Sequence, residues 1–243
     1  MTSQMIHDTT VEFYSKFCCI HLSQMEKQNW FVCSEERGEV LKGYGCRYTV
    51  YILVKDGRFI AAFSPEYRAV FEPWKQCGVS ELLTAANWRF RLKKLQLMIF
   101  DHETVTDFGA ARILHADDYP QYEAFFRETR PGVDAGGWLK DYFMEKAGKE
   151  YFAGYFLDGA LVSVADAPDM PYLEGRIQHT GVHTLARERR RGYATRTAAL
   201  ASHHLLERNI CPQWECSADN LASVALAESI GYKPYAQAYV LEE

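Results

Sequence analysis

Residues 189–194 read RRRGYA, and this stretch joins a strand-like segment to a helix of small residues. The backbone N–H groups in the first turn of a helix have no intrahelical partner and lie at the positive end of the helix dipole, so a helix start binds anions. Gly192 and Ala194 carry almost no side chain, which lets a phosphate approach those amides closely. The arginines add positive charge and Thr195 adds a hydroxyl donor. The stretch therefore predicts a loop that binds a pyrophosphate.

The segments on both sides of this loop have the patterns of α/β elements. Residues 176–184 (RIQHTGVHT) are rich in β-branched side chains, which predicts a strand, and residues 194–208 place alanine and leucine on one helical face. A strand over 210–217 and a helix over 221–230 follow. This order predicts an α/β half-domain with a parallel or mixed sheet and a ligand at the carboxyl ends of its strands.

The spacing of Arg189, Gly192 and Ala194 resembles the R/Q-x-x-G-x-G/A signature of the GNAT superfamily of acyl-CoA-dependent N-acetyltransferases. Residues 211–232 (CPQWECSADNLASVALAESIGY) resemble the last motif of that family and, within it, the subgroup that includes the zwittermicin self-resistance acetyltransferase. The resemblance covers residues 107–243. It implies an α/β (α+β, mixed-sheet) GNAT fold in the C-terminal half, with acetyl-CoA as co-substrate.

The resemblance also implies which residues bind the cofactor. The backbone amide of Val182 would polarise the thioester carbonyl, and the main chain of Thr184 would bond to the pantetheine arm. Asn220 and Ser223 match polar positions of the last motif. The expected cofactor-binding residues are therefore Val182, Thr184, Arg189, Arg190, Arg191, Gly192, Tyr193, Ala194, Thr195, Asn220 and Ser223.

The catalytic base departs from the family pattern. Many relatives carry a carboxylate on the strand before the loop, whereas the matching residue here is Gln178, which accepts no proton at neutral pH but can orient a water. Glu215 is the leading candidate for the base, followed by Glu174, His179 and His183, each with an alternative role as a surface acid or core-edge histidine. The expected catalytic residues are Gln178, Glu215 and His183.

The usual acid is also missing. Relatives often carry a tyrosine seven residues after the helix-start asparagine, and that position is Ala227 here. A thiol with a pKa near 8.5 is already a fair leaving group, so its protonation helps but is not required. Tyr232, Tyr235 and Tyr239 are candidate substitutes. The two departures also permit a non-catalytic acyl-CoA-binding or regulatory protein.

The strand before the loop carries a hint of distortion. Side chains alternate between the two faces of a strand, so Ile177 and Val182, five residues apart, would point to opposite faces. Both can be buried on one face only if an extra residue interrupts the alternation. Gly181 would then form a bulge that opens a cleft beside the next strand. The alternative is that one of the two side chains faces solvent.

Composition restricts the function classes. The chain has 243 residues, of which 48% are hydrophobic and 14% aromatic, and this suits a packed core. A net charge of −5 argues against nucleic-acid binding, which would be the function of the arginine loop in a third hypothesis. No apolar run approaches the roughly 20 residues of a membrane helix. The first ten residues lack the features of a signal peptide, so we expect a cytoplasmic protein without a membrane partner.

Cysteine and histidine patterns predict no metal site. The seven cysteines are an odd number, and Cys18 and Cys19 are adjacent, which argues against a secreted disulfide framework. The chain has no C-x-x-C pair and no H-E-x-x-H motif.

A polar string at residues 101–109 (DHETVTDFG) suggests a boundary that divides the chain into 1–106 and 107–243. The second part continues with a strand at 111–114, helices at 119–128 and 137–147, and a hairpin around Asp158-Gly159.

The first part predicts an accessory α/β domain. Its expected elements are a helix over 11–25, a strand over 29–33, a hairpin over 49–63 with its turn at Asp56-Gly57, and a helix over 79–87. We expect this domain to cover the acceptor cleft.

The resemblance implies an acetyl-CoA-dependent N-acetyltransferase. The amine of a small molecule, such as an antibiotic or an amino-acid-like metabolite, would attack the thioester directly, with no covalent enzyme intermediate. No nucleic-acid partner is expected. A homodimer is one expectation for the oligomeric state.

Overall fold

The computed structural model describes residues 1–243. Its strands are β1 (Trp30–Cys33), β2 (Tyr48–Lys55), β3 (Arg58–Phe63), β4 (Lys93–Phe100), β5 (Ala111–Ile113), β6 (Ala153–Leu157), β7 (Ala160–Asp166), β8 (Ile177–His179), β9 (Gly181–Thr184), β10 (Cys211–Ser217) and β11 (Tyr232–Glu242). Its α-helices are α1 (Ser3–Cys18), α2 (Arg68–Phe71), α3 (Val79–Phe90), α4 (Tyr119–Thr129), α5 (Leu139–Gly148), α6 (Tyr193–Glu207) and α7 (Leu221–Ser229). One sheet has the order β1-β3-β2-β11-β4-β10-β8 and the other the order β5-β6-β7-β9.

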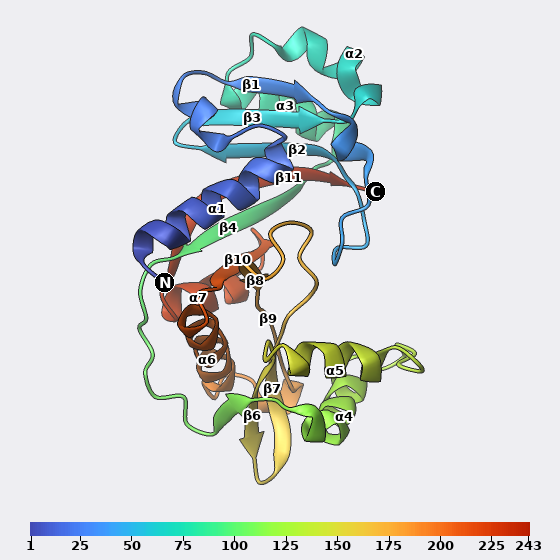
Figure 1. Cartoon of the computed structure of the whole chain (residues 1–243). Coiled ribbons are helices and arrows are strands. Elements are labelled where there is room, and N and C mark those ends of the chain that lie inside the picture. Colours follow the sequence, from blue (N-terminus) through green and yellow to red (C-terminus); the bar gives the residue numbers. More distant parts are fainter.

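Two strands join the halves of the sequence within the larger sheet (Figure 1). β4 pairs antiparallel with both β10 and β11, so that Leu97 stands opposite Glu215 on one side and Ala236 on the other. β11 in turn pairs antiparallel with β2. The division at residues 106/107 stays a prediction, but the larger sheet is continuous across the two parts.

Helix α1 lies on this sheet and contacts β2, β3, β4, β8 and β10. Thr2 caps its start, because the Thr2 hydroxyl accepts a hydrogen bond from the Met5 N–H at 3.2 Å. The left-handed Cys19, with a φ of 54°, ends it. The expected helix over 11–25 was therefore misplaced, because the helix starts at Ser3 and ends at Cys18.

The smaller sheet carries α4, which contacts β7. Its β6–β7 turn has Asp158 and Gly159 at φ values of 49° and 79°, which is the backbone that the predicted hairpin needs. Helix α6 contacts β5, β6, β7, β9 and β10, so it touches both sheets.

The expected strand over 176–184 is divided at Thr180. β8 pairs parallel with β10 in the larger sheet, whereas β9 pairs antiparallel with β7 in the smaller one. A Cβ atom at Gly181 would collide with the Asp166 carboxylate. The expected interruption therefore occurs, but as a change of partner strand and not as a bulge within one ladder.

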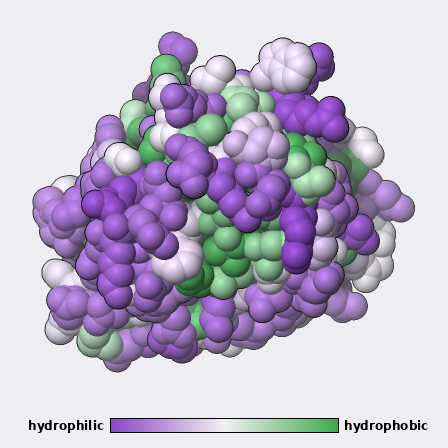
Figure 2. Space-filling model, turned by 90° about the horizontal axis from the view of Figure 1, so that it is seen from above, coloured by the Kyte–Doolittle hydropathy of each residue, from purple (hydrophilic) through white to green (hydrophobic).

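Most large apolar side chains are buried. The largest core cluster contains Phe17, Leu97 and Trp214 and so draws on both halves of the sequence. A second cluster joins α4 and α5 to the smaller sheet. Seen from above, the surface is mainly hydrophilic with one apolar area near its centre (Figure 2). Because the largest cluster spans both halves, we expect them to unfold together.

The other expected elements are confirmed within a few residues, including the first-half hairpin and α3. Sequence reasoning missed β4 and β11. The apolar run in β4 shows neither alternation nor a flanking turn signal. In β11, buried and exposed residues alternate along only part of the strand.

We predict that Leu97→Ala lowers the free energy of unfolding by about 2–5 kcal/mol, because Leu97 is fully buried in the strand that joins the halves. Urea unfolding should show one transition for the whole chain. The control is Lys94→Ala on the same strand, which removes an exposed side chain and should cost about 1 kcal/mol or less. Two separate transitions would contradict this prediction.

Candidate functional site

A cleft of about 680 Å³ opens where β9 and β10 diverge after Thr180. It is lined by His179, Thr180, Gly181, Val182, His183, Thr184, Arg189, Arg190, Ala194, Trp214, Glu215, Asn220, Ala222, Ser223 and Leu226. The cleft therefore brings together most of the residues expected to bind the cofactor, together with Glu215 and His183.

Strand β9 presents free backbone groups to this cleft. In an antiparallel ladder, hydrogen-bonded and non-hydrogen-bonded residue pairs alternate. The Leu185 N–H bonds to the Val162 carbonyl, so the pairs Ser163–Thr184 and Ala165–Val182 are the non-hydrogen-bonded ones. The N–H and C=O groups of Val182 and Thr184 consequently point away from β7 and toward β10.

The start of α6 forms one end of the cleft. Gly192 precedes the helix with a φ of 78°, a left-handed conformation that glycine adopts at little cost. Arg190 also has a positive φ, of 63°. The Arg189 Nε donates to the Thr184 carbonyl at 3.4 Å, which ties the loop to the edge of β9.

Four residues of the expected loop lie outside the cleft. Arg191, Gly192 and Thr195 line a different hollow of about 530 Å³ together with residues 104–107. The Tyr193 ring stacks on Tyr155 at a centroid distance of 4.5 Å. Their expected cofactor contacts stay predictions, since these side chains face the far side of the helix start.

At the opposite wall, the expected polar residues of α7 have local partners. The Asn220 side chain accepts from the Ser223 N–H at 3.2 Å and caps the helix. The Ser223 hydroxyl contacts the Trp214 Nε1 at 3.2 Å. These bonds hold α7 against β10 and position both residues in the cleft lining.

Two candidate residues are directed away from the cleft. Gln178 is buried, and its amide donates to the carbonyls of Pro168 at 2.8 Å and His179 at 3.1 Å. It therefore holds the backbone of these residues and does not line the cleft. Glu174 pairs with Lys42 and Lys149, and these two lysines lower its pKa to about 2. Neither environment suits a proton acceptor at neutral pH.

His183 lies in the cleft lining with its ring committed to other contacts. Its Nε2 lies 2.8 Å from the Arg130 guanidinium, which can only donate, so this nitrogen is the acceptor. Burial lowers the pKa of His183, Asp166 opposes this effect, and Arg130 lowers the pKa further. Its expected catalytic role stays a prediction.

Glu215 faces α1 and the loop before β2. The Tyr44 hydroxyl donates to its Oε1 at 2.7 Å, and the Gln213 amide donates to its Oε2 at 3.1 Å. Burial and the Glu215 charge raise the pKa of Tyr44 well above its usual value, so Tyr44 stays a protonated donor.

Sequence reasoning missed both hydrogen-bond partners of Glu215. Gln213 shares a strand face with Glu215, which alternation could have indicated, whereas Tyr44 carried no local signal.

The loop that carries Tyr44 docks on residues 169–174. Lys42 pairs with Glu174 at 2.7 Å, and the buried Arg37 donates to the Tyr172 hydroxyl at 2.8 Å. Gly43 has a φ of 77°, and a Cβ atom there would collide with the Asp169 carbonyl. The first half of the sequence therefore contacts the cleft through the bond from Tyr44 to Glu215, a lining residue.

The tyrosines considered as substitute acids do not line the cleft. Tyr232 is buried with its hydroxyl 3.0 Å from Ser202, and Tyr235 stacks on Tyr14. The Tyr239 hydroxyl contacts Gln237 at 3.2 Å. Ala227, at the position of the usual acid, is fully buried.

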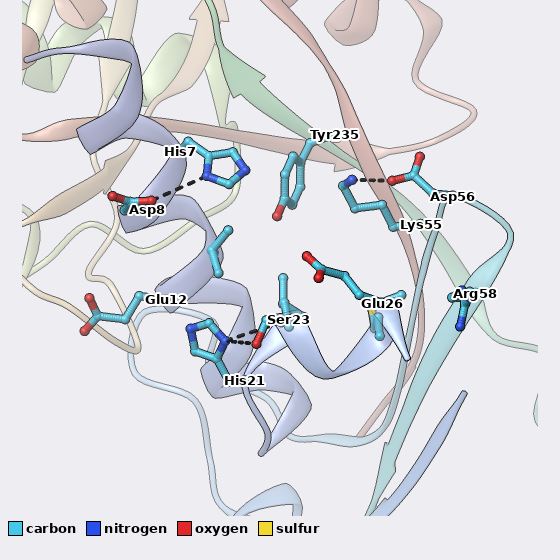
Figure 3. Close-up of a pocket in the computed structure, with 13 residues that line it drawn as sticks. His7, Asp8, Glu12, His21, Ser23, Glu26, Lys55, Asp56, Arg58 and Tyr235 are labelled. Carbon is cyan, nitrogen blue, oxygen red and sulfur yellow. Dashed lines mark hydrogen bonds and ion pairs between the residues drawn. The ribbon is translucent and has the colours of Figure 1, made fainter. Parts of the chain in front are cut away.

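A second hollow, of about 740 Å³, lies elsewhere. Figure 3 shows His7, His21, Glu26 and Tyr235 around it, between α1 and the β2–β3 turn. Its charged residues are of both signs, and Lys55 pairs with Asp56. None of the expected site residues lines it.

No group of three or more His, Cys, Asp or Glu residues could hold a metal ion. No helix in the structure combines the length and apolar character needed to cross a membrane.

The comparisons with known proteins agree with this geometry. Residues 158–241 match the model of the family described as GNAT acetyltransferase, and this segment contains both walls of the cleft. An acetyltransferase of the GNAT family from Colwellia psychrerythraea is 10% identical over 79% of this chain and 81% of that chain, with a TM-score of 0.54. The C-terminal part therefore has the GNAT fold, as predicted.

A second solved structure, a GNAT-family acetyltransferase from Novosphingobium aromaticivorans, is 25% identical over 63% of this chain, with a TM-score of 0.47. The chain spans 65% of that protein, which is just under two thirds of its length. A search of curated proteins found no match.

We predict that Gly43→Ala destabilises the protein much more than Gly45→Ala. Both glycines have a positive φ, which costs an alanine about 1–2 kcal/mol, but only the Cβ atom at position 43 meets the Asp169 carbonyl. Thermal unfolding of the two variants measures the difference. Equal melting temperatures would show that the loop does not dock on residues 169–174.

Proposed function

We propose that the protein transfers an acetyl group from acetyl-CoA to the amine of a small molecule. One observation carries this proposal: free backbone N–H groups of Val182 and Thr184 face a cleft that ends at the α6 N-terminus beside Arg189 and Arg190. These are the donors that an acyl-CoA needs along its length, and they occur within a GNAT fold.

The cofactor would lie between β9 and β10 with its pyrophosphate at the α6 N-terminus. The partial positive charge of the helix start and the two guanidinium groups stabilise this anion. The Thr184 main chain would bond to the pantetheine arm. The Val182 N–H would then donate to the thioester carbonyl oxygen.

In the reaction, the amine nitrogen forms a bond to the carbonyl carbon while the carbon–sulfur bond breaks. Negative charge develops on the carbonyl oxygen, where a fixed N–H donor is worth about 2.7–4 kcal/mol in enzymes that use one. The amine loses a proton, and the CoA thiolate leaves. A thiolate is a stable enough leaving group for the step to proceed without a cleft tyrosine.

For the acceptor, we propose an antibiotic or amino-acid-like amine, on the resemblance to the zwittermicin-resistance subgroup. We further propose that residues 1–106 form an accessory domain on the acceptor side, supported by the Tyr44–Glu215 bond. A cytoplasmic location and a homodimer stay predictions.

The proposal is tested by isothermal titration of the protein with acetyl-CoA and with CoA. Micromolar binding followed by thiol release with at least one member of a primary-amine panel is the expected result. Binding without thiol release across amino acids, polyamines and aminoglycosides would instead indicate a non-catalytic acyl-CoA-binding protein. Absence of binding to either ligand would overturn the proposal.

We predict that Ala194→Leu raises the dissociation constant of acetyl-CoA at least about tenfold, or 1.4 kcal/mol, because the added side chain fills the anion end of the cleft. The matched control is Ala225→Leu, an exposed alanine on α7 outside the cleft lining, which should leave the constant unchanged. Equal affinity in both variants would place the pyrophosphate elsewhere.

A further inference from the structure

A chain of hydrogen bonds connects two residues of the cleft lining, His179 and Glu215, to the first half of the sequence. The His179 Nδ1 lies 2.6 Å from the Gln213 Oε1. The Gln213 Nε2 donates to the Glu215 Oε2 at 3.1 Å and to the Tyr14 hydroxyl at 2.9 Å. Tyr44 completes the chain with its bond to the other Glu215 oxygen.

The chemistry of this chain sets the direction of each bond. An ionised carboxylate only accepts, so the Gln213 amide nitrogen must face Glu215, and its carbonyl oxygen must face His179. The oxygen needs a donor, so the His179 Nδ1 must carry the hydrogen. In a neutral imidazole the other nitrogen then holds the free lone pair. The network therefore selects the tautomer in which the His179 Nε2 is the basic atom.

His179 lines the cleft where the strands diverge. His179 ends β8 immediately before Thr180, and Val182 follows two residues later, so the imidazole and the Val182 amide belong to one short stretch of the cleft wall. The His179 Nδ1 is engaged with Gln213, whereas Nε2 has no hydrogen-bond partner in the protein. The hydroxyl of the next residue, Thr180, is buried and also has no partner.

The other titratable cleft groups are already engaged. Both oxygens of Glu215 accept hydrogen bonds from Tyr44 and Gln213, and the Nε2 of His183 accepts from Arg130. The His183 Nε2 would have to give up its bond to Arg130 before it could take a proton, and each Glu215 oxygen already faces a protein donor. The His179 Nε2 has no such partner.

We propose that the His179 Nε2 is the general base that removes the proton from the acceptor amine, and that Gln213 and Glu215 are positioning residues that hold it in the basic tautomer. This inference rests on the proposed acetyl transfer. As the nitrogen–carbon bond forms and the carbon–sulfur bond breaks, the amine proton moves to Nε2. The imidazolium then releases it to the CoA thiolate or to solvent.

The first test reads the tautomer directly and needs no acceptor. In the histidine-labelled protein, nitrogen NMR should show a pyrrole-like Nδ1 and a pyridine-like Nε2 for His179, assigned by the loss of its signals in His179→Asn. Gln213→Leu should abolish this preference, because the acceptor for Nδ1–H is gone. A hydrogen on Nε2 in the wild-type protein would overturn the proposal.

The second test separates the base from the cofactor site. In His179→Asn the asparagine amide can still donate to Gln213, but the Nε2 lone pair is removed. We expect kcat to fall by about 10²–10⁴ with the most active amine of the panel. The dissociation constant of acetyl-CoA should stay within about twofold, because the substitution leaves Val182 and Arg189 unchanged. His7→Asn, at the exposed hollow of Figure 3, is the control.

The pH profile gives a readout that a merely structural role would not move. If the His179 Nε2 is the base, the rising limb of the wild-type kcat/KM profile should vanish in His179→Asn and shift in Gln213→Leu. The titratable and charged groups around the network are Glu215, His183, Tyr14, Tyr44, Arg130, Arg189 and Arg190. An unchanged kcat and pH profile in His179→Asn would overturn the proposal, whereas failure of the wild-type protein to bind acetyl-CoA would overturn the proposed function itself.

Discussion

The change of partner strand at Thr180 is the constraint on which the functional architecture depends. Before Thr180 the chain pairs with β10, and after it the chain pairs with β7, so the backbone groups of Val182 and Thr184 lose their neighbour on one side. Unpaired backbone groups are costly when buried, so they must face solvent or a ligand. The cleft, the exposed donors and the place of His179 in its lining all follow from this one divergence.

The first half of the sequence is built into the site through the larger sheet. β4 occupies the place between β10 and β11, and α1 lies across strands of both halves. This arrangement places Tyr14 and Tyr44 against Gln213 and Glu215. The polar network can persist in a low-dielectric interior because each of its members has a partner. The first half of the sequence thus both stabilises the larger sheet and orients the candidate base.

Local patterns were sufficient for the elements whose formation depends on neighbouring residues. The positive-φ pairs at Asp56-Gly57 and Asp158-Gly159 determine their hairpins, and the Asn220 cap and Gly231 delimit α7. The helix start at Gly192 could also be predicted, because its left-handed backbone and the small residue at position 194 are local properties. β4 and β11 could not be placed, because their partners lie far away in the sequence.

The sequence by itself determined the helix-start loop, the order of elements after residue 110, and the residue types available for chemistry, since these depend on backbone preference and on resemblance within short motifs. Only the tertiary structure decided which side chains face the cleft. Gln178 is turned to backbone carbonyls, His183 is engaged by Arg130, and His179 is joined to Glu215 through Gln213. The physical reason is that a hydrogen-bond direction depends on which donor and acceptor meet in space, and β8, β10, α1 and the loop before β2 meet only in the folded sheet.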